Sequence, residues 1–300
     1  MALTSANFAP DAKTPDRYLI IGFDTEYQRF LNKDTGKIEN EVLSFQYSAI
    51  IVNIDPDVDP IRWNGLIKPK GGSVDDRLTI NEFVEHTVKS GVAKFSKLLV
   101  PKIIYLVAHF TRADVPGFKD FKEKSSRENL NLQNIRNLFM NVSKDIKITI
   151  KDADDGPDIN LSLKIRDTLA LAPGGAKSLS AIGDILGFEK IKVAERPEDE
   201  LFIKQNMKTL MKKDWDLFEA YAIRDADICA EYALRMIRLY QEKTEKFKMP
   251  VTLTAIGVDM IIRYWKQHGI DPLEIVGKEK KIVRYWSKKN DRYQTIEKAV

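Results

Sequence analysis

The chain has 300 residues, of which 43% are hydrophobic and 31% are charged, and its formal net charge is +4. This balance is typical of a globular protein with a large core, and no apolar stretch is long enough for a membrane-spanning helix. The single cysteine excludes an internal disulfide, and the three widely separated histidines exclude a zinc site of the usual spacing.

The first third of the chain predicts a sheet built around one buried strand. Residues 1–16 are polar and are expected to be a loose lead-in. The unbroken apolar run at 18–23 predicts a strand that is buried on both faces. Residues 42–52 and 61–67 predict two further strands, and the three together would form an antiparallel meander.

Alternating helices and strands are predicted next. Residues 79–82 have a capping-box sequence, which predicts a helix that ends near residue 90. The apolar residues 102–108 predict a second fully buried strand, and residues 127–140 are expected to be helical. Residues 146–150 and 159–165 flank a strong turn signal, so they predict a β-hairpin.

Helices dominate the remaining part of the chain. A short helix is expected to end before Gly187, a long helix to run from an Asp214 N-cap to about residue 247, and another to cover 251–268. Strands and helices with mixed connections predict an α/β fold in which helices flank the sheet.

Positive charge is concentrated at the C-terminal end. Residues 243–300 contain 13 Lys and Arg against 7 Asp and Glu, a net charge of +6, and aromatic residues are interleaved with them. This composition suits phosphate contacts and base stacking. It is equally typical of a solvated helical face with aromatic residues packed underneath, so both interpretations stay open.

Two acids follow the first buried strand directly. Because side chains alternate along a strand, Asp24 and Glu26 point to the same face. Two like charges beside a core repel each other and resist desolvation. The pair therefore indicates either a strand that has reached solvent or a site for a divalent cation, and the short motif alone does not decide.

Two further acids stand in similar positions. Asp225 falls in the apolar stripe of the predicted long helix, four residues after Tyr221 and four before Cys229. A buried carboxylate needs a partner, which would be either a cation or a buried arginine. Asp114 comes a few residues after the second buried strand, where functional groups of α/β proteins gather, although alone it is typical of an ordinary turn.

In this order the four acids resemble the DEDD superfamily of proofreading 3′→5′ exonucleases, which have a ribonuclease H-like fold. Residues 22–26 (Gly-Phe-Asp-Thr-Glu) resemble the first motif of that superfamily, and residues 107–114 resemble the second. Residues 221–225 match the third motif, YxxxD, of the tyrosine branch, whereas the histidine branch would need His where Ala220 stands. The resemblance covers about residues 18–240, and the combined pattern is specific where each motif alone is weak.

Residues 166–187 are similar to the corresponding stretch of family B DNA polymerases from plasmids, phages and organelles. The resemblance implies a mixed sheet flanked by helices, an inserted β-hairpin and a helical basic C-terminal extension. It divides the chain into a lead-in (1–16), an exonuclease domain (17–247) and an extension or linker (248–300) toward a polymerase domain in cis beyond Val300. No palm-domain motif is visible, so a polymerase fragment and a stand-alone relative both fit.

The resemblance also implies a chemistry and a set of roles. Two Mg²⁺ or Mn²⁺ ions would assist phosphodiester hydrolysis at a single-stranded DNA 3′ end. Asp24 would hold both ions, Glu26 and Asp225 the ion that activates water, and Asp114 the second ion. Tyr221 would position the attacking water, because an unperturbed phenol titrates near pH 10 and is a poor base.

Alternatives within the resemblance are an exoribonuclease of the same superfamily and a catalytically silent DNA-binding module. The second motif departs from the usual pattern, since His109 stands where Asn is common and Ala113 where Phe or Tyr is common. This departure leaves the local backbone and the role of His109 open. The N-terminal residues lack a secretory signal pattern and cysteine is scarce, so a cytoplasmic location without membrane attachment is expected.

Overall fold

The computed structural model describes residues 2–12, 14–33, 36–127, 132–135, 139–142, 144–278, 280–287 and 292–299. The strands are β1 (Arg17–Leu31), β2 (Ile38–Asn53), β3 (Ile61–Ile67), β4 (Ile103–Ala108), β5 (Leu132–Ile135), β6 (Phe139–Val142), β7 (Ile146–Ile150), β8 (Ile159–Asp167), β9 (Lys280–Ser287) and β10 (Arg292–Ala299). The helices are α1 (Ile80–Lys94), α2 (Thr111–Asp114), α3 (Phe121–Arg127), α4 (Leu179–Leu186), α5 (Pro197–Gln205), α6 (Met207–Lys213), α7 (Trp215–Thr244), α8 (Leu253–Gln267) and α9 (Pro272–Ile275).

Six strands form one mixed sheet in the order β3-β2-β1-β4-β8-β7. The strands β3, β2 and β1 pair antiparallel, as the predicted meander requires, whereas β4 pairs parallel with β1 and with β8. The predicted hairpin is confirmed as β7 and β8. Both of its strands belong to the main sheet, and β7 forms one edge of it. A mixed sheet with flanking helices is consistent with a ribonuclease H-like α/β fold.

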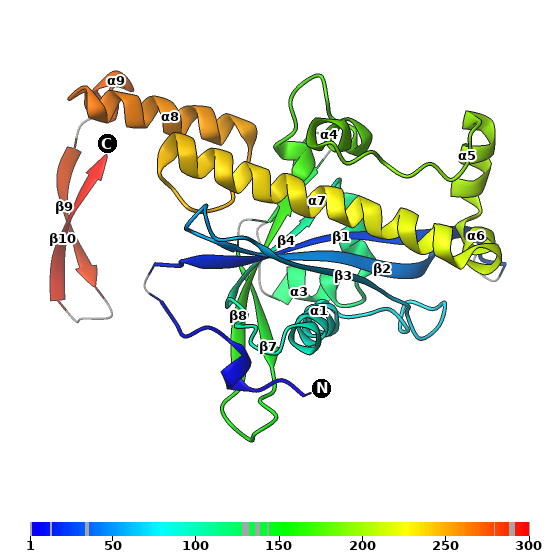
Figure 1. The fold of residues 1–300 in the computed structure, drawn as a ribbon. Coiled ribbons are helices and arrows are strands. Elements are labelled where there is room, and N and C mark those ends of the chain that lie inside the picture. The colour runs from blue at the N-terminus through cyan, green and yellow to red at the C-terminus, as the bar shows by residue number, and fades with distance from the viewer. Residues whose placement is uncertain are drawn as a thin grey trace.

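Helices cover both faces of the sheet (Figure 1). The strand β1 is apolar on both sides: Leu19, Ile21 and Phe23 pack in the cluster that includes α1, while Tyr18 and Ile20 pack in the cluster that includes α7. This arrangement confirms the prediction of a fully buried strand. No helix among the described residues is both long and apolar enough to cross a membrane.

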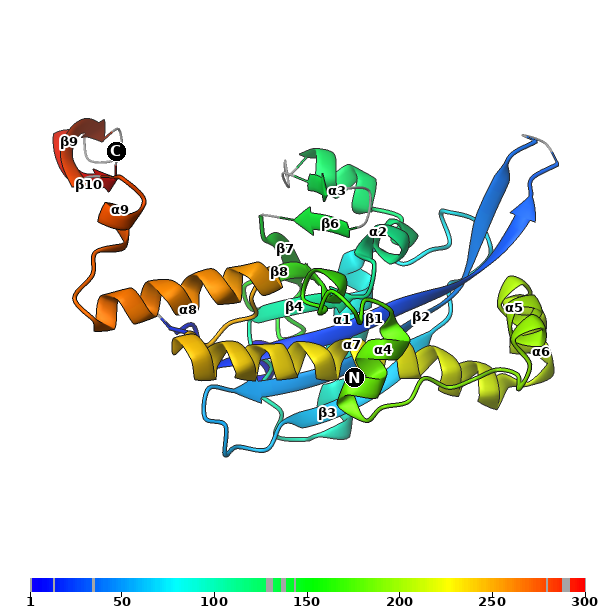
Figure 2. The ribbon, with the colours of Figure 1, turned by 90° about the horizontal axis from the view of Figure 1, so that it is seen from above.

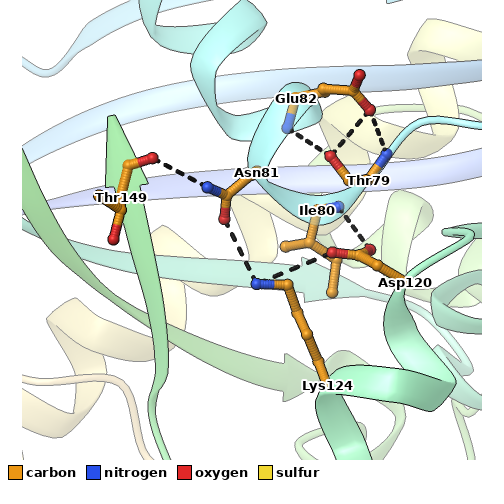
Figure 3. Close-up of polar contacts among 7 residues, drawn as sticks. All are labelled: Thr79, Ile80, Asn81, Glu82, Asp120, Lys124 and Thr149. Atoms are coloured by element: carbon orange, nitrogen blue, oxygen red, sulfur yellow. Dashed lines mark hydrogen bonds and ion pairs between the residues drawn. The ribbon is translucent and has the colours of Figure 1, made fainter. Parts of the chain in front are cut away.

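The first helix is fixed by its N-terminal residues (Figure 3). Thr79 and Glu82 form the predicted capping box, in which each side chain bonds the other's backbone N–H. The N–H of Ile80 donates to Asp120 at 2.9 Å, and Asn81 donates to the carbonyl of Thr149 on β7 at 2.9 Å. These bonds hold α1 against the sheet, on the face opposite to α7.

Two predictions of helix are wrong in the described residues. The segment 127–140 contains the end of α3 and the strands β5 and β6, which pair antiparallel, while 128–131 and 136–138 lie outside the described residues. Asparagine recurs through this segment and disfavours a helix interior. The C-terminal extension is helical only to Ile275, because β9 and β10 then pair antiparallel. The β-branched and aromatic run in β9 favours a strand.

Candidate active site

The strand β1 and the helix α7 lie in direct contact, and this contact positions the candidate acids. Gly22 allows it: a Cβ added there would lie 2.3 Å from the carbonyl oxygen of Ala226 and 2.6 Å from the backbone nitrogen of Ala230. Asp24 follows Gly22 by two residues and faces the same side of β1, and Asp225 immediately precedes Ala226. The close packing of the two backbones therefore brings the two carboxylates together.

The two acids of β1 are partly buried and carry strongly perturbed pKa values. Burial, followed by the charge of Asp225, raises the pKa of Asp24 to about 7. Gln46, its register partner on β2, donates a hydrogen bond to Asp24 at 2.7 Å and opposes this rise. Burial raises the pKa of Glu26 well above its ordinary value, and the charges of Asp24 and Asp225 add to the rise.

Asp114 reaches the same region from the end of β4. The pairing of β1 with β4 ends at Gly22, so the edge of β1 is open at Thr25. The hydroxyl of Thr25 donates to Asp114 Oδ1 at 2.9 Å, and the Asp114 side chain is buried. Burial, followed by the charge of Asp24, raises the pKa of Asp114 well above its ordinary value.

Asp167, at the end of β8, holds the turn that delivers Asp114. Its carboxylate accepts hydrogen bonds from the backbone N–H groups of Phe110 at 3.0 Å, Thr111 at 2.9 Å and Leu169 at 3.0 Å. Phe110 has φ of 66°, a left-handed conformation that is an outlier for a bulky residue. This turn, held by Asp167, contains His109 and Ala113, the two residues at which the second exonuclease-like motif departs from the usual sequence. The His109 Nδ1 lies 2.9 Å from the Thr168 hydroxyl, and burial lowers the pKa of His109 to about 4.

Asp225 is buried on α7, and its partner is a lysine rather than the arginine considered from the sequence. Lys190 Nζ lies 2.7 Å from Asp225 Oδ2, whereas Asp225 Oδ1 is buried and forms no hydrogen bond with any described residue. Burial raises the pKa of Asp225, and Lys190 opposes this rise. The positive charge of Lys190 also opposes the rise in the pKa of Asp24 and of Glu26. One ammonium group therefore favours the ionised form of three carboxylates.

No pattern in the sequence identifies Lys190 as a residue of this site. It lies in the segment between α4 and α5, among alternating charged and apolar residues that are typical of an exposed loop. Its contact with Asp225 spans 35 positions of the chain, and no spacing rule connects the two.

Tyr221 lies one helical turn before Asp225 and is buried. Burial, followed by the charge of Glu26, raises the pKa of the phenol, so it stays protonated at neutral pH. The Lys190 ammonium lies 5.6 Å from the centre of the Tyr221 ring. A protonated phenol at this position can donate a hydrogen bond but cannot accept a proton as a base.

All five residues singled out from the sequence thus act on one region, through hydrogen bonds or through charge. In the positions described, however, their side chains do not form a complete coordination site for a metal ion. Among the residues that the structure describes, no group of three or more His, Cys, Asp or Glu side chains is arranged to hold a metal ion. The carboxylates perturb one another's pKa without converging on one point.

Two comparisons with known proteins bear on this site. No protein-family model matches the chain. The chain is 26% identical, over 94% of its length, to a protein named "Primer-independent DNA polymerase PolB" from Escherichia coli. It spans only about a third (32%) of that relative's length. The similarity supports a polymerase-related domain and leaves its particular activity to be proposed.

Proposed function

We propose that this chain is a metal-dependent 3′→5′ exonuclease that releases nucleotides from DNA 3′ ends, either as the proofreading part of a family B DNA polymerase or as a stand-alone relative. The observation that carries the proposal is the acid cluster, in which burial and neighbouring carboxylates raise the pKa of Asp24 and Glu26. Strongly perturbed acids of this kind are typical of functional sites. The similarity to a protein named as a DNA polymerase supports DNA as the substrate class.

The donor set suits a hard divalent cation. Carboxylate oxygens without Cys or His are the ligands that Mg²⁺ and Mn²⁺ prefer, and Asp225 Oδ1 is a buried oxygen without a described partner. When bound, two such ions would supply positive charge to the entering and leaving oxygens of a phosphodiester. Because Lys190 occupies the other oxygen of Asp225, binding would require side chains to move from the positions described.

The residues of the chain would have separate tasks. Asp24, Glu26 and Asp225 would hold the cations, and Asp114, oriented by the Thr25 hydroxyl, would support the second of them. Gln46 would keep Asp24 turned toward α7. The Tyr221 hydroxyl would orient the attacking water by a hydrogen bond, because its raised pKa keeps the proton on the phenol.

A single-stranded DNA oligonucleotide labelled at its 5′ end tests the proposal. With Mg²⁺ or Mn²⁺ the protein is expected to shorten it from the 3′ end in steps of one nucleotide, and EDTA is expected to stop the reaction. An RNA oligonucleotide of the same sequence, degraded in parallel, identifies the substrate class. Preferential loss of the RNA would replace the DNA assignment, and no degradation of either strand would favour a silent binding module.

Variants of the acids assign the reaction to the site. Asp24→Ala and Asp225→Ala are each expected to abolish degradation while circular dichroism shows a retained fold. Asp216→Ala is the matched control, because Asp216 is an exposed carboxylate in the first turn of the same helix. Degradation that persists in either acid variant would rule out the assigned site.

A further inference from the structure

A cavity of about 640 Å³ lies beside the candidate site and is lined by Glu26 and Tyr221. Its other walls come from Arg29 near the end of β1 and from residues of α5 and α6. Figures 1 and 2 show α5 and α6 together at the end of the molecule where α7 begins. Because two residues of the candidate site line this cavity, a molecule bound in it would also reach the acids.

The wall formed by α5 and α6 is fixed at its base. Gln28 on β1 donates to the carbonyl of Gln205 at 2.8 Å, and Lys208 on α6 forms an ion pair with Glu41 on β2 at 2.7 Å. By contrast, α5 itself contains no buried residue. The helix is therefore anchored beside the cavity, while its own side chains remain available to a ligand.

An apolar side chain on α5 faces this cavity. Leu201 lines it although 60% of the residue is exposed, whereas the adjacent Phe202, 67% exposed, does not line it. An exposed leucine gains little from the hydrophobic effect in the folded chain, because little of its surface is removed from water. It suits the apolar face of a nucleotide base, which side chains of single-strand binding proteins cover.

Two cations line the same cavity. Lys204 Nζ lies 5.9 Å from the centre of the Tyr221 ring and forms an ion pair with Glu200 on its own helix at 2.6 Å. The guanidinium of Arg29 lies 5.9 Å from the ring centre of Tyr27 and makes no ion pair with the part of the chain that the structure describes. A guanidinium without an acidic partner, beside a candidate phosphodiester site, suits a phosphate.

We propose that this cavity binds the terminal one or two nucleotides of a single strand, with Leu201 against a base and Arg29 and Lys204 on the phosphates. The volume lies within the range of about 300–1,000 Å³ that is usual for small-molecule sites. The proposal rests on the proposed function for the identity of the ligand. Its test uses binding alone, so the two can fail separately.

Binding of a fluorescently labelled short oligothymidylate, measured by anisotropy in EDTA over a salt series, tests this proposal. Leu201→Ala is expected to weaken binding about tenfold at every salt concentration, since a base contact does not depend on counterions. Arg29→Ala and Lys204→Ala are each expected to reduce the salt slope by about 0.7, the value for one phosphate contact on a single strand.

Two control variants make the result specific to the cavity. Phe202→Ala removes an equally exposed side chain from the same helix, and Lys212→Ala removes an exposed lysine from α6; neither residue lines the cavity. Both are expected to bind as the wild type does. Wild-type affinity in Leu201→Ala, or an equal loss in Phe202→Ala, would overturn the proposal.

Exonuclease activity and nucleotide binding in the cavity can be tested independently. If the wild-type protein leaves DNA intact but the variants lose affinity in the expected pattern, the cavity binds nucleotides and the exonuclease assignment is wrong. If the protein degrades DNA while all three cavity variants bind and degrade it as the wild type does, the exonuclease assignment stands and the cavity assignment is wrong.

Discussion

Asp24 lies where an ionised carboxylate is costly, and this cost can be measured without any substrate. Its pKa is raised to about 7 in the folded protein, against about 3.9 for an unperturbed aspartate. Between these values the folded state binds more protons than the unfolded state, so the free energy of unfolding falls as the pH rises from about 4 to 7. Above that window the whole penalty is present.

We expect Asp24→Asn to remove this penalty, because asparagine does not titrate and can still accept the hydrogen bond from Gln46. In EDTA the variant is expected to melt at a higher temperature than the wild type at pH 8, and the difference is expected to shrink toward pH 4. Scanning calorimetry at several pH values measures it. A wild-type protein that melts higher than the variant at pH 8 would contradict the role given to Asp24.

The same gain is not expected at Asp225. Removing this carboxylate would leave the Lys190 ammonium without the oxygen that lies 2.7 Å from it, and Lys190 is itself largely buried, with its side chain only 24% exposed. The loss of the ion pair would offset the relief of repulsion. Asp24 is therefore the position at which repulsion among the acids can be measured separately.

Tyr221→Phe is expected to lower the rate of DNA degradation on the order of 10²-fold, because the water would lose the hydroxyl that orients it. The dependence of the rate on pH should keep its shape, since the raised pKa of the phenol keeps it protonated throughout the neutral range. Metal affinity should not change. A full rate in the variant would reduce Tyr221 to a packing residue, and a displaced pH profile would identify it as a base.

At the scale of elements, the contact between β1 and α7 sets the geometry of the site. Gly22→Ala would place a methyl group 2.3 Å from the Ala226 carbonyl oxygen, so one backbone must move. We expect the variant to lose about 1–3 kcal/mol of stability or more, and to lose activity in greater proportion, because Asp24 and Asp225 would separate.

Gly257→Ala is the matched control for that variant. Gly257 lies in α8, and an added Cβ would meet nothing within 4 Å. Alanine there is expected to stabilise the protein by about 0.4–1 kcal/mol. Chemical denaturation of both variants measures the contrast, and equal effects at the two glycines would show that the β1–α7 contact is not tight.

The elements that the sequence predicted well are those with strong local signals. The apolar run of β1, the Asp214 cap of α7 and the left-handed Gly187 that ends α4 all follow from a few adjacent residues. The sequence does not predict α5 or α6: α5 buries no residue and so shows no apolar stripe, and α6 is only seven residues long and buries only Met207 and Leu210. The position of α5 beside the cavity depends on the contact of Gln205 with Gln28 on β1, which no local pattern contains.

The sequence predicted the acids of the candidate site but not the residues that position these acids or change their pKa values. Asp24, Glu26, Asp114 and Asp225 could be found because each interrupts or ends an apolar segment. Lys190 and Asp167 act on these acids or on the Asp114 turn from distant parts of the chain. Their contribution is tertiary, so only the fold reveals it.

At the scale of the whole molecule, the basic C-terminal segment is the part whose role a truncation tests. Residues 280–287 and 292–299 form a two-stranded sheet beyond α9, and Lys288 and Lys289 lie outside the described residues. We expect the segment either to contact nucleic acid or to act as a linker.

Removing the residues after Gly277 distinguishes the two roles. If the basic side chains contact phosphates, the truncation should flatten the salt dependence of single-strand binding by about 0.7 log units per lost contact. It should leave degradation of a very short oligonucleotide unchanged, because the four acids precede the cut. Identical slopes for the full chain and the truncation would exclude the segment as a nucleic-acid contact and leave the linker role.

If the four acids form one cation site, calorimetric titration of Mn²⁺ into the protein measures that site without any nucleic acid. We expect the wild type to bind Mn²⁺ with release of protons near pH 7, because carboxyl groups with raised pKa values must ionise to bind a cation. Both the binding and the proton release should be lost or strongly reduced in Asp24→Ala and in Asp225→Ala. Binding of the same stoichiometry and affinity in these variants would show that Asp24 and Asp225 do not hold the cation.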